Sequence, residues 1–299
     1  MRKASRMKKI LLGQNHLHTI GGSETFIYSM AKQMTQMGHQ VDIVTMQPGF
    51  VSELINREFG CNINIFRDSY DVAFLNHTTI VNGIKSMFPG GKIIQTCHGI
   101  YPALEQPVGG VRHVAISLEV SNHLKSKGYE SVIIHNGVDC EVFSPHEPTS
   151  PVVKRIFSLS QSDVFNQTLQ TICKKKNLVF SCNNKFTSPR IDIHNAIRDS
   201  DLVFSLGRGA YEAMACARPV IVADQRQYQP GMMDGIITSE NISLYLENNC
   251  SGRKMQREVT EESLISEIEK YDSTQGVRNR QFALSNLNIV NQVEEYLKL

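Results

Sequence analysis

A glycine-rich turn follows an apolar run in the second half of the chain. Residues 201–206 (DLVFSL) have the length of a buried strand, and the turn Gly207, Arg208 and Gly209 leads into good helix formers that carry Glu212. A second apolar run, PVIVAD, comes next, so the segment predicts strand, turn, helix and strand. Arg208 and the free N–H groups at the start of the helix suit an anion, whereas a glutamate suits hydroxyl groups beside that anion.

Histidines occupy further places where chemistry could occur. His98 ends the apolar run KIIQTCHG, and His16 and His18 lie just before a Gly-Gly pair. Because the carboxyl ends of parallel strands are where open α/β folds bind ligands, we expect His98 in the cleft, with His16 and His18 as weaker candidates for the same place. No carboxylates surround the His-Leu-His triplet, so we expect no metal site.

The composition is that of an ordinary soluble globular protein. The chain has 299 residues, 41% hydrophobic and 20% charged, with a formal net charge of +2. This length predicts about two domains, and the small charge does not indicate a nucleic-acid binder. The seven cysteines form no C-x-x-C pair and lie mostly in apolar runs, which is typical of reduced thiols in a cytoplasmic protein.

The N-terminus is basic, with Arg2, Lys3, Arg6, Lys8 and Lys9 close together. Its apolar part is too short for a signal peptide, and no run in the chain reaches the length that spans a bilayer. We interpret the basic lead-in as a solvated tail, with a weak contact to anionic lipid at the membrane surface as the alternative.

Short apolar runs alternate with amphipathic helical patterns over most of the chain, as in KKILLGQ followed by SETFIYSMAKQMTQMG. Such alternation predicts a doubly wound parallel sheet. Three prolines between Pro145 and Pro151 indicate a linker, after which the alternation restarts. We therefore predict an α/β chain with an N-terminal Rossmann-like domain over residues 1–147, a second over residues 148–280, and a C-terminal helix over residues 281–299.

Three segments resemble glycosyltransferases of the GT-B fold, specifically the retaining family 4. These are GGSETFIYSMAKQMTQMGHQVDIVT, IIHNGVDCEVFSP and DLVFSLGRGAYEAMACARPVIVAD, in the family's order. The resemblance implies two Rossmann-like domains facing a cleft, with a nucleoside-diphosphate-sugar as co-substrate and no further cofactor. It also implies that the last helix crosses back to the N-terminal domain.

The resemblance carries roles to individual residues. Glu212 would accept hydrogen bonds from the ribose, and Gly21 and Gly22 would bring backbone N–H groups to the phosphates, unless they only make a tight turn. His98 would contact the transferred sugar or the acceptor. Asn136 and Asp139 would shape the turn that leaves the first domain.

This sequence also departs from the family. The glutamate usually found eight positions before Glu212 is replaced by Phe204, and the Arg and Lys expected near SLSQSDVFNQ are missing. We expect Lys185 and Arg208, which follow apolar strands, to bind the diphosphate in place of the missing cations. We also expect Arg208 to be catalytic. Gly209 would complete the donor-binding turn.

The leading hypothesis is a metal-independent retaining hexosyltransferase acting on a glycan, lipid-linked or small-molecule acceptor. Two alternatives stay open: a transferase acting on modified DNA bases, which would need a basic acceptor face, and an inactive protein that binds sugar nucleotides. A dinucleotide-dependent oxidoreductase fits less well, since HTIGGSE is not a G-x-G-x-x-G motif.

Overall fold

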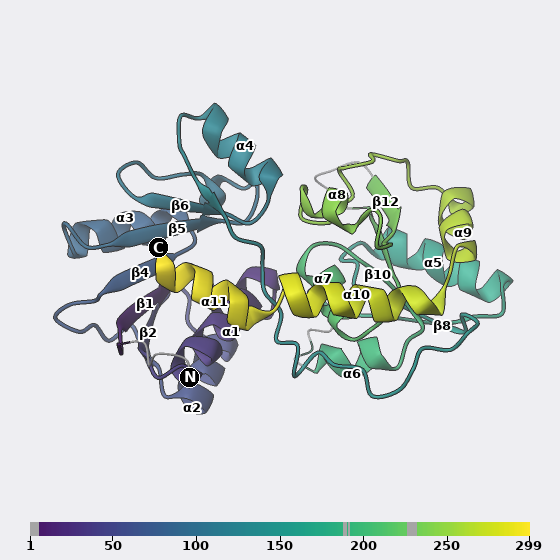
Figure 1. The fold of residues 1–299 in the computed structure, drawn as a ribbon, viewed down its shortest axis with the longest axis horizontal. Coiled ribbons are helices and arrows are strands. Elements are labelled where there is room, and N and C mark those ends of the chain that lie inside the picture. The colour runs from purple at the N-terminus through teal and green to yellow at the C-terminus, as the bar shows by residue number, and fades with distance from the viewer. Residues whose placement is uncertain (1–5, 188–189, 191, 226–231) are drawn as a thin grey trace. The chain divides into compact units, whose positions relative to one another are not determined.

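The computed structural model describes residues 6–187, 190, 192–225 and 232–299. Arg2 and Lys3, two of the basic residues at the N-terminus, lie outside these ranges. The chain divides into two compact units, which Figure 1 shows as ribbons: residues 1–135 with 292–299 form the N-terminal unit, and residues 136–291 form the C-terminal unit. Each is an α/β unit built on its own sheet.

The N-terminal unit contains a parallel sheet in the order β3-β2-β1-β4-β5-β6-β7. The strands are β1 (Lys9–Gly13), β2 (Gln40–Val44), β3 (Asn62–Ile63), β4 (Val72–Leu75), β5 (Ile93–Cys97), β6 (Arg112–Ala115) and β7 (Val132–Ile133). The central strand β1 pairs with β2 and β4, and Ile10, Leu11 and Leu12 are almost fully buried. Strands covered on both faces are expected to be apolar throughout, which is the pattern of this segment.

Helices and one 3₁₀ turn connect the strands of this sheet. They are α1 (Gly22–Gln36), α2 (Phe50–Phe59), α3 (Thr78–Met87), the 3₁₀ turn η1 (Ala103–Glu105) and α4 (Leu118–Ser126). The last eight residues of the chain, most of them in α11 (Ile289–Lys298), belong to the same unit. There Tyr296 is fully buried, and its hydroxyl lies 2.9 Å from Thr96 Oγ1.

The C-terminal unit contains a second sheet in the order β12-β11-β10-β8-β9. Its strands are β8 (Arg155–Ser158), β9 (Val179–Cys182), β10 (Leu202–Ser205), β11 (Val220–Asp224) and β12 (Met232–Ile236). All neighbours pair in parallel except β11 and β12, which are antiparallel. The two doubly wound, mainly parallel sheets predicted from the sequence are thus confirmed.

The helices of this unit are α5 (Asp163–Lys175), α6 (Ile193–Arg198), α7 (Arg208–Ala215), α8 (Ile242–Leu246), α9 (Glu261–Glu269) and α10 (Ser273–Asn286). Helix α10 packs closely on the turn after α7, where a Cβ on Gly276 would collide with the carbonyl oxygen of Ala217. Figure 1 shows α7 and α10 side by side.

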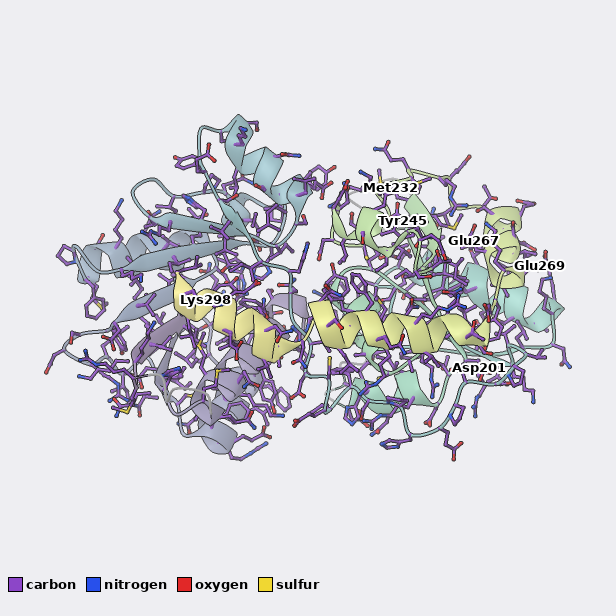
Figure 2. The ribbon with its side chains drawn as sticks, in the orientation of Figure 1. Asp201, Met232, Tyr245, Glu267, Glu269 and Lys298 are labelled. Atoms are coloured by element: carbon purple, nitrogen blue, oxygen red, sulfur yellow. The ribbon has the colours of Figure 1, made fainter. Side chains whose placement is uncertain are left out.

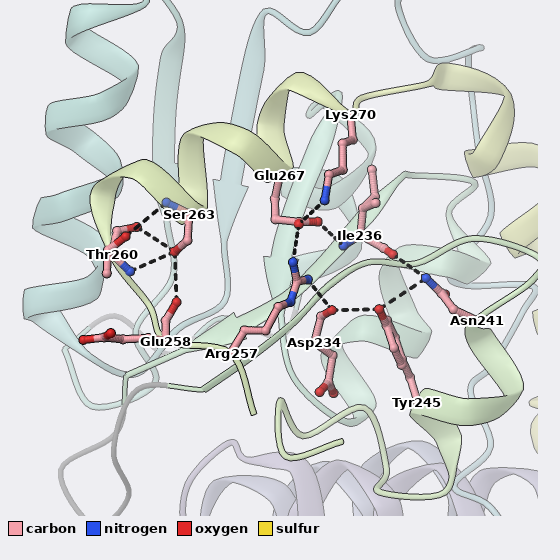
Figure 3. Close-up of polar contacts among 10 residues, drawn as sticks. All are labelled: Asp234, Ile236, Asn241, Tyr245, Arg257, Glu258, Thr260, Ser263, Glu267 and Lys270. Carbon is pink, nitrogen blue, oxygen red and sulfur yellow. Dashed lines mark hydrogen bonds and ion pairs between the residues drawn. The ribbon is translucent and has the colours of Figure 1, made fainter. Parts of the chain in front are cut away.

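Strand β12 was not predicted, and a buried polar network holds it in place (Figure 3). Glu267 of α9 is 1% exposed and accepts hydrogen bonds from Arg257 Nη1 (2.7 Å) and from the backbone N–H of Ile236 (2.8 Å). Asp234, also buried, accepts the N–H groups of Gly252 and Met255. The antiparallel pairing therefore depends on contacts between distant segments, which the local sequence pattern does not reveal.

The segment expected as one helix over residues 281–299 is the end of α10 followed by α11. Between them the backbone of Leu287 and Ile289 pairs with Val138: the Val138 N–H donates to the Leu287 carbonyl (2.7 Å), and the Ile289 N–H donates to the Val138 carbonyl (3.0 Å). These bonds use backbone groups that a continuous helix would need, so the helix breaks there. The turn that precedes Val142 is capped as expected, because Asp139 Oδ1 accepts the N–H groups of Glu141 and Val142.

Among the described residues, no helix is both long and apolar enough to cross a membrane.

Candidate functional site

In the C-terminal unit, the loop after β10 leads into α7 at the carboxyl edge of the sheet. Gly207 precedes the helix with φ at 54°, a left-handed conformation that glycine adopts readily. Helix α7 begins at Arg208, so Glu212 is its fifth residue and lies in the second turn. The N-terminus of the helix lies at this edge, where a phosphate would be favoured.

Arg208 and Glu212 form a buried ion pair along α7. The side chains are 8% and 11% exposed, and Arg208 Nε lies 2.9 Å from Glu212 Oε1. Arg208 Nη1 also donates to the Gly137 carbonyl oxygen at 2.9 Å. Burial raises the pKa of Glu212, while the charge and hydrogen bond of Arg208 act in the opposite direction. The structure thus brings together two residues that were predicted from the sequence to bind the donor.

Gly209 allows α7 to approach the end of β10 closely. A Cβ at this position would collide with Ser205 Oγ and would lie 3.1 Å from Leu159 Cδ1. A larger residue would therefore push the start of the helix away from the sheet. Gly209 stays a predicted donor-binding residue, and its packing role is a second reason for a glycine here.

Lys185 follows β9 at the same edge, two strands from β10. Its backbone N–H donates to Gln161 Oε1 at 2.7 Å, which ties this loop to the one after β8. The side chain is exposed, and its Nζ lies 5.0 Å from the centroid of the Phe186 ring. Lys185 is therefore available to a ligand at this edge, although the structure does not bring it to Arg208.

The structure shows what replaces the two features of the family pattern that this sequence lacks. Phe204 lies inside β10 and is fully buried, so its side chain packs in the core where the family has a glutamate. After β8, where cations were expected, Ser160 donates a hydrogen bond to Asp224 Oδ1 at the end of β11. The strand ends next to α7 are thus joined by a neutral hydroxyl and a carboxylate.

A polar pocket opens at the opposite, amino-terminal edge of the same sheet. Its lining includes Arg198, Arg218 and Asp201, the residue directly before β10. Figure 2 labels Asp201. Arg198 Nε donates to the Ser144 carbonyl (2.6 Å) and Arg218 Nη1 to Thr149 Oγ1 (2.9 Å), so these cations hold the Pro-rich segment predicted as a linker. We assign this pocket a structural role.

In the N-terminal unit, Gly21 and Gly22 stand at the start of α1. Gly21 is the residue before the helix and has an extended backbone, and a Cβ on Gly22 would meet nothing within 4 Å. Sterics therefore do not require a glycine at position 22. Glu24, in the first turn, is buried, which fits a glutamate at a helix N-terminus. The proposed phosphate contact of the two glycines stays a prediction.

The histidines of this unit gather at the carboxyl edge of its sheet. His16 follows β1, and its ring centroid lies 5.9 Å from that of His18 and 5.7 Å from that of His77, which follows β4. His98 follows β5 and packs against Phe26 of α1 with 4.7 Å between ring centroids. The predicted candidates His16, His18 and His98 thus lie at one edge.

Glu105, in the 3₁₀ turn after β5, connects two of these histidines. Its Oε1 lies 3.4 Å from His77 Nε2, and its Oε2 accepts the His98 backbone N–H at 2.7 Å. Burial acts to raise the pKa of Glu105, but the hydrogen bond from His77 and the nearby His98 outweigh it and lower this pKa. Glu105 is therefore an ionised, buried carboxylate at neutral pH.

His77 and Glu105 were not among the residues predicted from the sequence. His77 had the same signal as His98, a histidine directly after an apolar run, here DVAFLNH. Glu105 had no such signal, because it lies in a short 3₁₀ turn and meets the histidines only through the fold.

We expect Glu105 to stabilise the fold at neutral pH and to lose this contribution in acid. A carboxyl whose pKa is lower in the folded protein stabilises the fold above its unfolded pKa, and this stability is lost as the pH falls through the folded value. We expect Glu105→Gln to lower the free energy of unfolding at pH 7 by more than at pH 3. Urea unfolding at the two pH values measures this difference, and an equal loss at both would contradict the assignment.

The described residues contain no cluster of three or more His, Cys, Asp or Glu side chains arranged to hold a metal ion. The absence of a metal site therefore stays an expectation.

Neither protein-family models nor curated protein sequences match this chain. Solved structures do: a glycosyltransferase from Rickettsia africae is 15% identical with a TM-score of 0.65, covering 98% of this chain and 97% of its own. The catalytic domain of starch synthase IV from Arabidopsis thaliana, bound to ADP and acarbose, is 10% identical with a TM-score of 0.55 and covers 98% of both chains.

A third similar structure is an α-glucosyltransferase in complex with UDP and a mismatched 13-mer DNA. It is 11% identical with a TM-score of 0.58, covering 97% of this chain and 99% of its own. At such low identity, these similarities establish an architecture. The chain has the two-domain GT-B fold of the glycosyltransferases.

Proposed function

We propose that the chain is a glycosyltransferase that moves a hexose from a nucleoside-diphosphate-sugar to a glycan, lipid-linked or small-molecule acceptor. The observation that carries the proposal is the Arg208–Glu212 pair at the start of α7, at the carboxyl edge of the C-terminal sheet. A guanidinium at the N-terminus of a helix suits a diphosphate, and a carboxylate one turn further suits the ribose hydroxyls. The similar solved structures bound to UDP or ADP support this proposal.

We further propose that transfer retains the anomeric configuration and needs no metal. Negative charge grows on the departing diphosphate in the transition state, and Arg208 with the N-terminus of α7 would stabilise it. The departing phosphate oxygen can accept the proton of the acceptor hydroxyl, so no strong base is required. We place the enzyme in the cytoplasm, with the basic N-terminus as a weak contact to anionic membranes.

The test is hydrolysis and transfer with a panel of UDP-, ADP-, GDP- and dTDP-sugars, in EDTA, with the anomer of the product read by NMR. We expect turnover of at least one donor and a retained product. Binding of a donor without turnover would support the inactive alternative instead, and transfer only to a DNA duplex carrying modified bases would support the DNA alternative.

Arg208→Ala is expected to lower kcat by about 100-fold, the lower end of the effect of removing one oxyanion donor. The donor KM should change less, because the diphosphate gains charge toward the transition state. Arg208→Lys keeps a charge that can pair with Glu212 and should lose less. Lys174→Ala, which removes an exposed cation in the last turn of α5, is the matched control. If donor affinity and rate fell by the same factor, Arg208 would bind the ground state and the transition state equally well.

A further inference from the structure

The two outer strands of the C-terminal sheet, β12 and β9, differ in how their outer edges are covered. Along β12, the backbones of Met233 and Arg257 exchange two hydrogen bonds of 3.0 and 3.2 Å, and Glu267 accepts the N–H of Ile236. Along β9, no described residue outside β8 pairs with the strand. Within the part of the chain that the structure describes, the fold therefore closes one edge of this sheet and leaves the other open.

The open edge of β9 presents the backbone groups of Phe180 and Cys182. The Val179 N–H donates to the Lys154 carbonyl at 2.8 Å, and the Asn183 N–H donates to the last carbonyl of β8 at 2.9 Å. Because the backbone groups of alternate residues point to opposite sides of a strand, Phe180 and Cys182 direct theirs away from β8. Such a row of unpaired N–H and carbonyl groups is a template for one more strand.

The side chains around this edge are exposed and mostly uncharged. Val179 is 62% exposed, and Ser181 and Cys182 are exposed as well. Edge strands that stay unpaired are usually protected by a charged residue or a proline, and β9 (VFSC) contains neither. Between Asp163 and Lys174, the exposed positions of α5 also carry no charge: Val164, Gln167, Gln170 and Thr171. This composition suits a surface that another protein chain covers.

The edge is complementary to a second copy of itself. In an antiparallel pair centred on Ser181, Phe180 of each copy lies opposite Cys182 of the other, so every outward N–H group meets a carbonyl of the other copy. Val179 of one copy then lies diagonally across from Ser181 of the other on the same face, where apolar contact is added to the backbone bonds.

The charges near the edge also fit this arrangement. A two-fold axis normal to the joined sheet places both copies of α5 on one face, running in opposite directions. Asp163 in the first turn of one α5 then lies level with Lys174 in the last turn of the other. The two lysines after Lys174 are paired with glutamates of α9, and Lys185 of each copy lies opposite the neutral Asn177. The complementary charges favour a second copy of this chain as the occupant.

We propose that β9 is the interface of a symmetric homodimer, in which two C-terminal sheets join edge to edge into one continuous sheet. This inference goes beyond the proposed glycosyltransferase function and does not depend on it. Because the two sheets run in opposite directions, their carboxyl edges face opposite ways. The Arg208–Glu212 pair of each copy therefore stays accessible to its own donor.

Sedimentation equilibrium of the full-length protein over a concentration series measures the association. We expect a monomer–dimer equilibrium, and Val179→Lys should weaken the dimer about tenfold or more, because symmetry buries the added charge twice. Val277→Lys, at a residue of α10 that is 58% exposed, is the matched control and should leave the equilibrium unchanged. A dimer that Val179→Lys leaves intact overturns the proposal. A wild type that stays monomeric also overturns it and leaves this edge to a strand from another protein.

Disulfide trapping tests the register of the pairing. Opposite residues of a non-hydrogen-bonded antiparallel pair have Cα atoms about 4.5 Å apart, a separation that a disulfide can bridge. Cys182→Ser removes the exposed thiol, and the other cysteines are buried. In that background, we expect Ser181→Cys to form a covalent dimer under mild oxidation, whereas Val277→Cys should not. If Ser181→Cys forms no more covalent dimer than Val277→Cys, the β9 interface is overturned.

Discussion

Glu212→Ala is expected to lower the free energy of unfolding of the C-terminal unit by about 3–5 kcal/mol, because it leaves the Arg208 charge buried without its carboxylate. A residue that contacted only the ligand could be replaced without a loss of stability. The ion pair, with side chains 8% and 11% exposed, adds a structural cost. Urea unfolding measures the loss, with nucleotide-sugar affinity falling by a further 1.5–3 kcal/mol, about the value of a charged hydrogen bond.

Glu212→Gln separates the two effects. The amide oxygen can still accept the hydrogen bond from Arg208 Nε, so part of the stability should return, while the neutral amide binds the ribose hydroxyls more weakly than the carboxylate does. If both variants unfold like the wild type, the buried pair contributes nothing to the fold. Wild-type nucleotide affinity in Glu212→Gln would remove Glu212 from the donor site.

Tyr296→Ala is expected to destabilise the N-terminal unit by about 3–5 kcal/mol, the usual cost of removing a buried aromatic ring. The side chain is fully buried, and its ring centroid lies 5.3 Å from that of Phe74 in β4 and 6.3 Å from that of Phe26 in α1. Truncation would leave a cavity beside the central strands. Thermal unfolding of the full chain, followed by a probe in the N-terminal unit, measures the effect.

Two controls define this prediction. Tyr296→Phe removes only the hydroxyl that lies 2.9 Å from Thr96 Oγ1, so it should cost about 1 kcal/mol. Lys298→Ala, two residues further along α11, should cost less than either because its side chain is exposed. A Tyr296→Ala variant as stable as Lys298→Ala would show that the C-terminal residues do not support this unit.

The sequence was sufficient for the architecture because the apolar strands are local features. Runs such as KKILLGQ and PVIVAD become β1 and β11, since strands buried on both faces need nearly continuous apolar residues. Strand β12 and the break before α11 were missed. Both depend on pairing between segments far apart in sequence, at Glu267 and at Val138.

The candidate sites were only partly predictable for the same reason. Arg208 and Glu212 are four residues apart on one helix, so their proximity follows from helical periodicity once the helix is placed. His77 and Glu105 meet across 28 positions of the chain through the fold of the sheet edge. Residue type and position after a strand could have suggested His77, but nothing local could have suggested Glu105.

The central claim is that the carboxyl edge of the C-terminal sheet binds a nucleoside-diphosphate-sugar through Arg208 and Glu212. Calorimetric titration of the nucleotide-sugar panel into the wild type and into Glu212→Gln tests it most directly. We expect at least one donor to bind the wild type and to bind Glu212→Gln at least tenfold more weakly, as for a lost charged hydrogen bond. Equal binding to both proteins, or no binding of any nucleotide sugar to the wild type, would contradict the account.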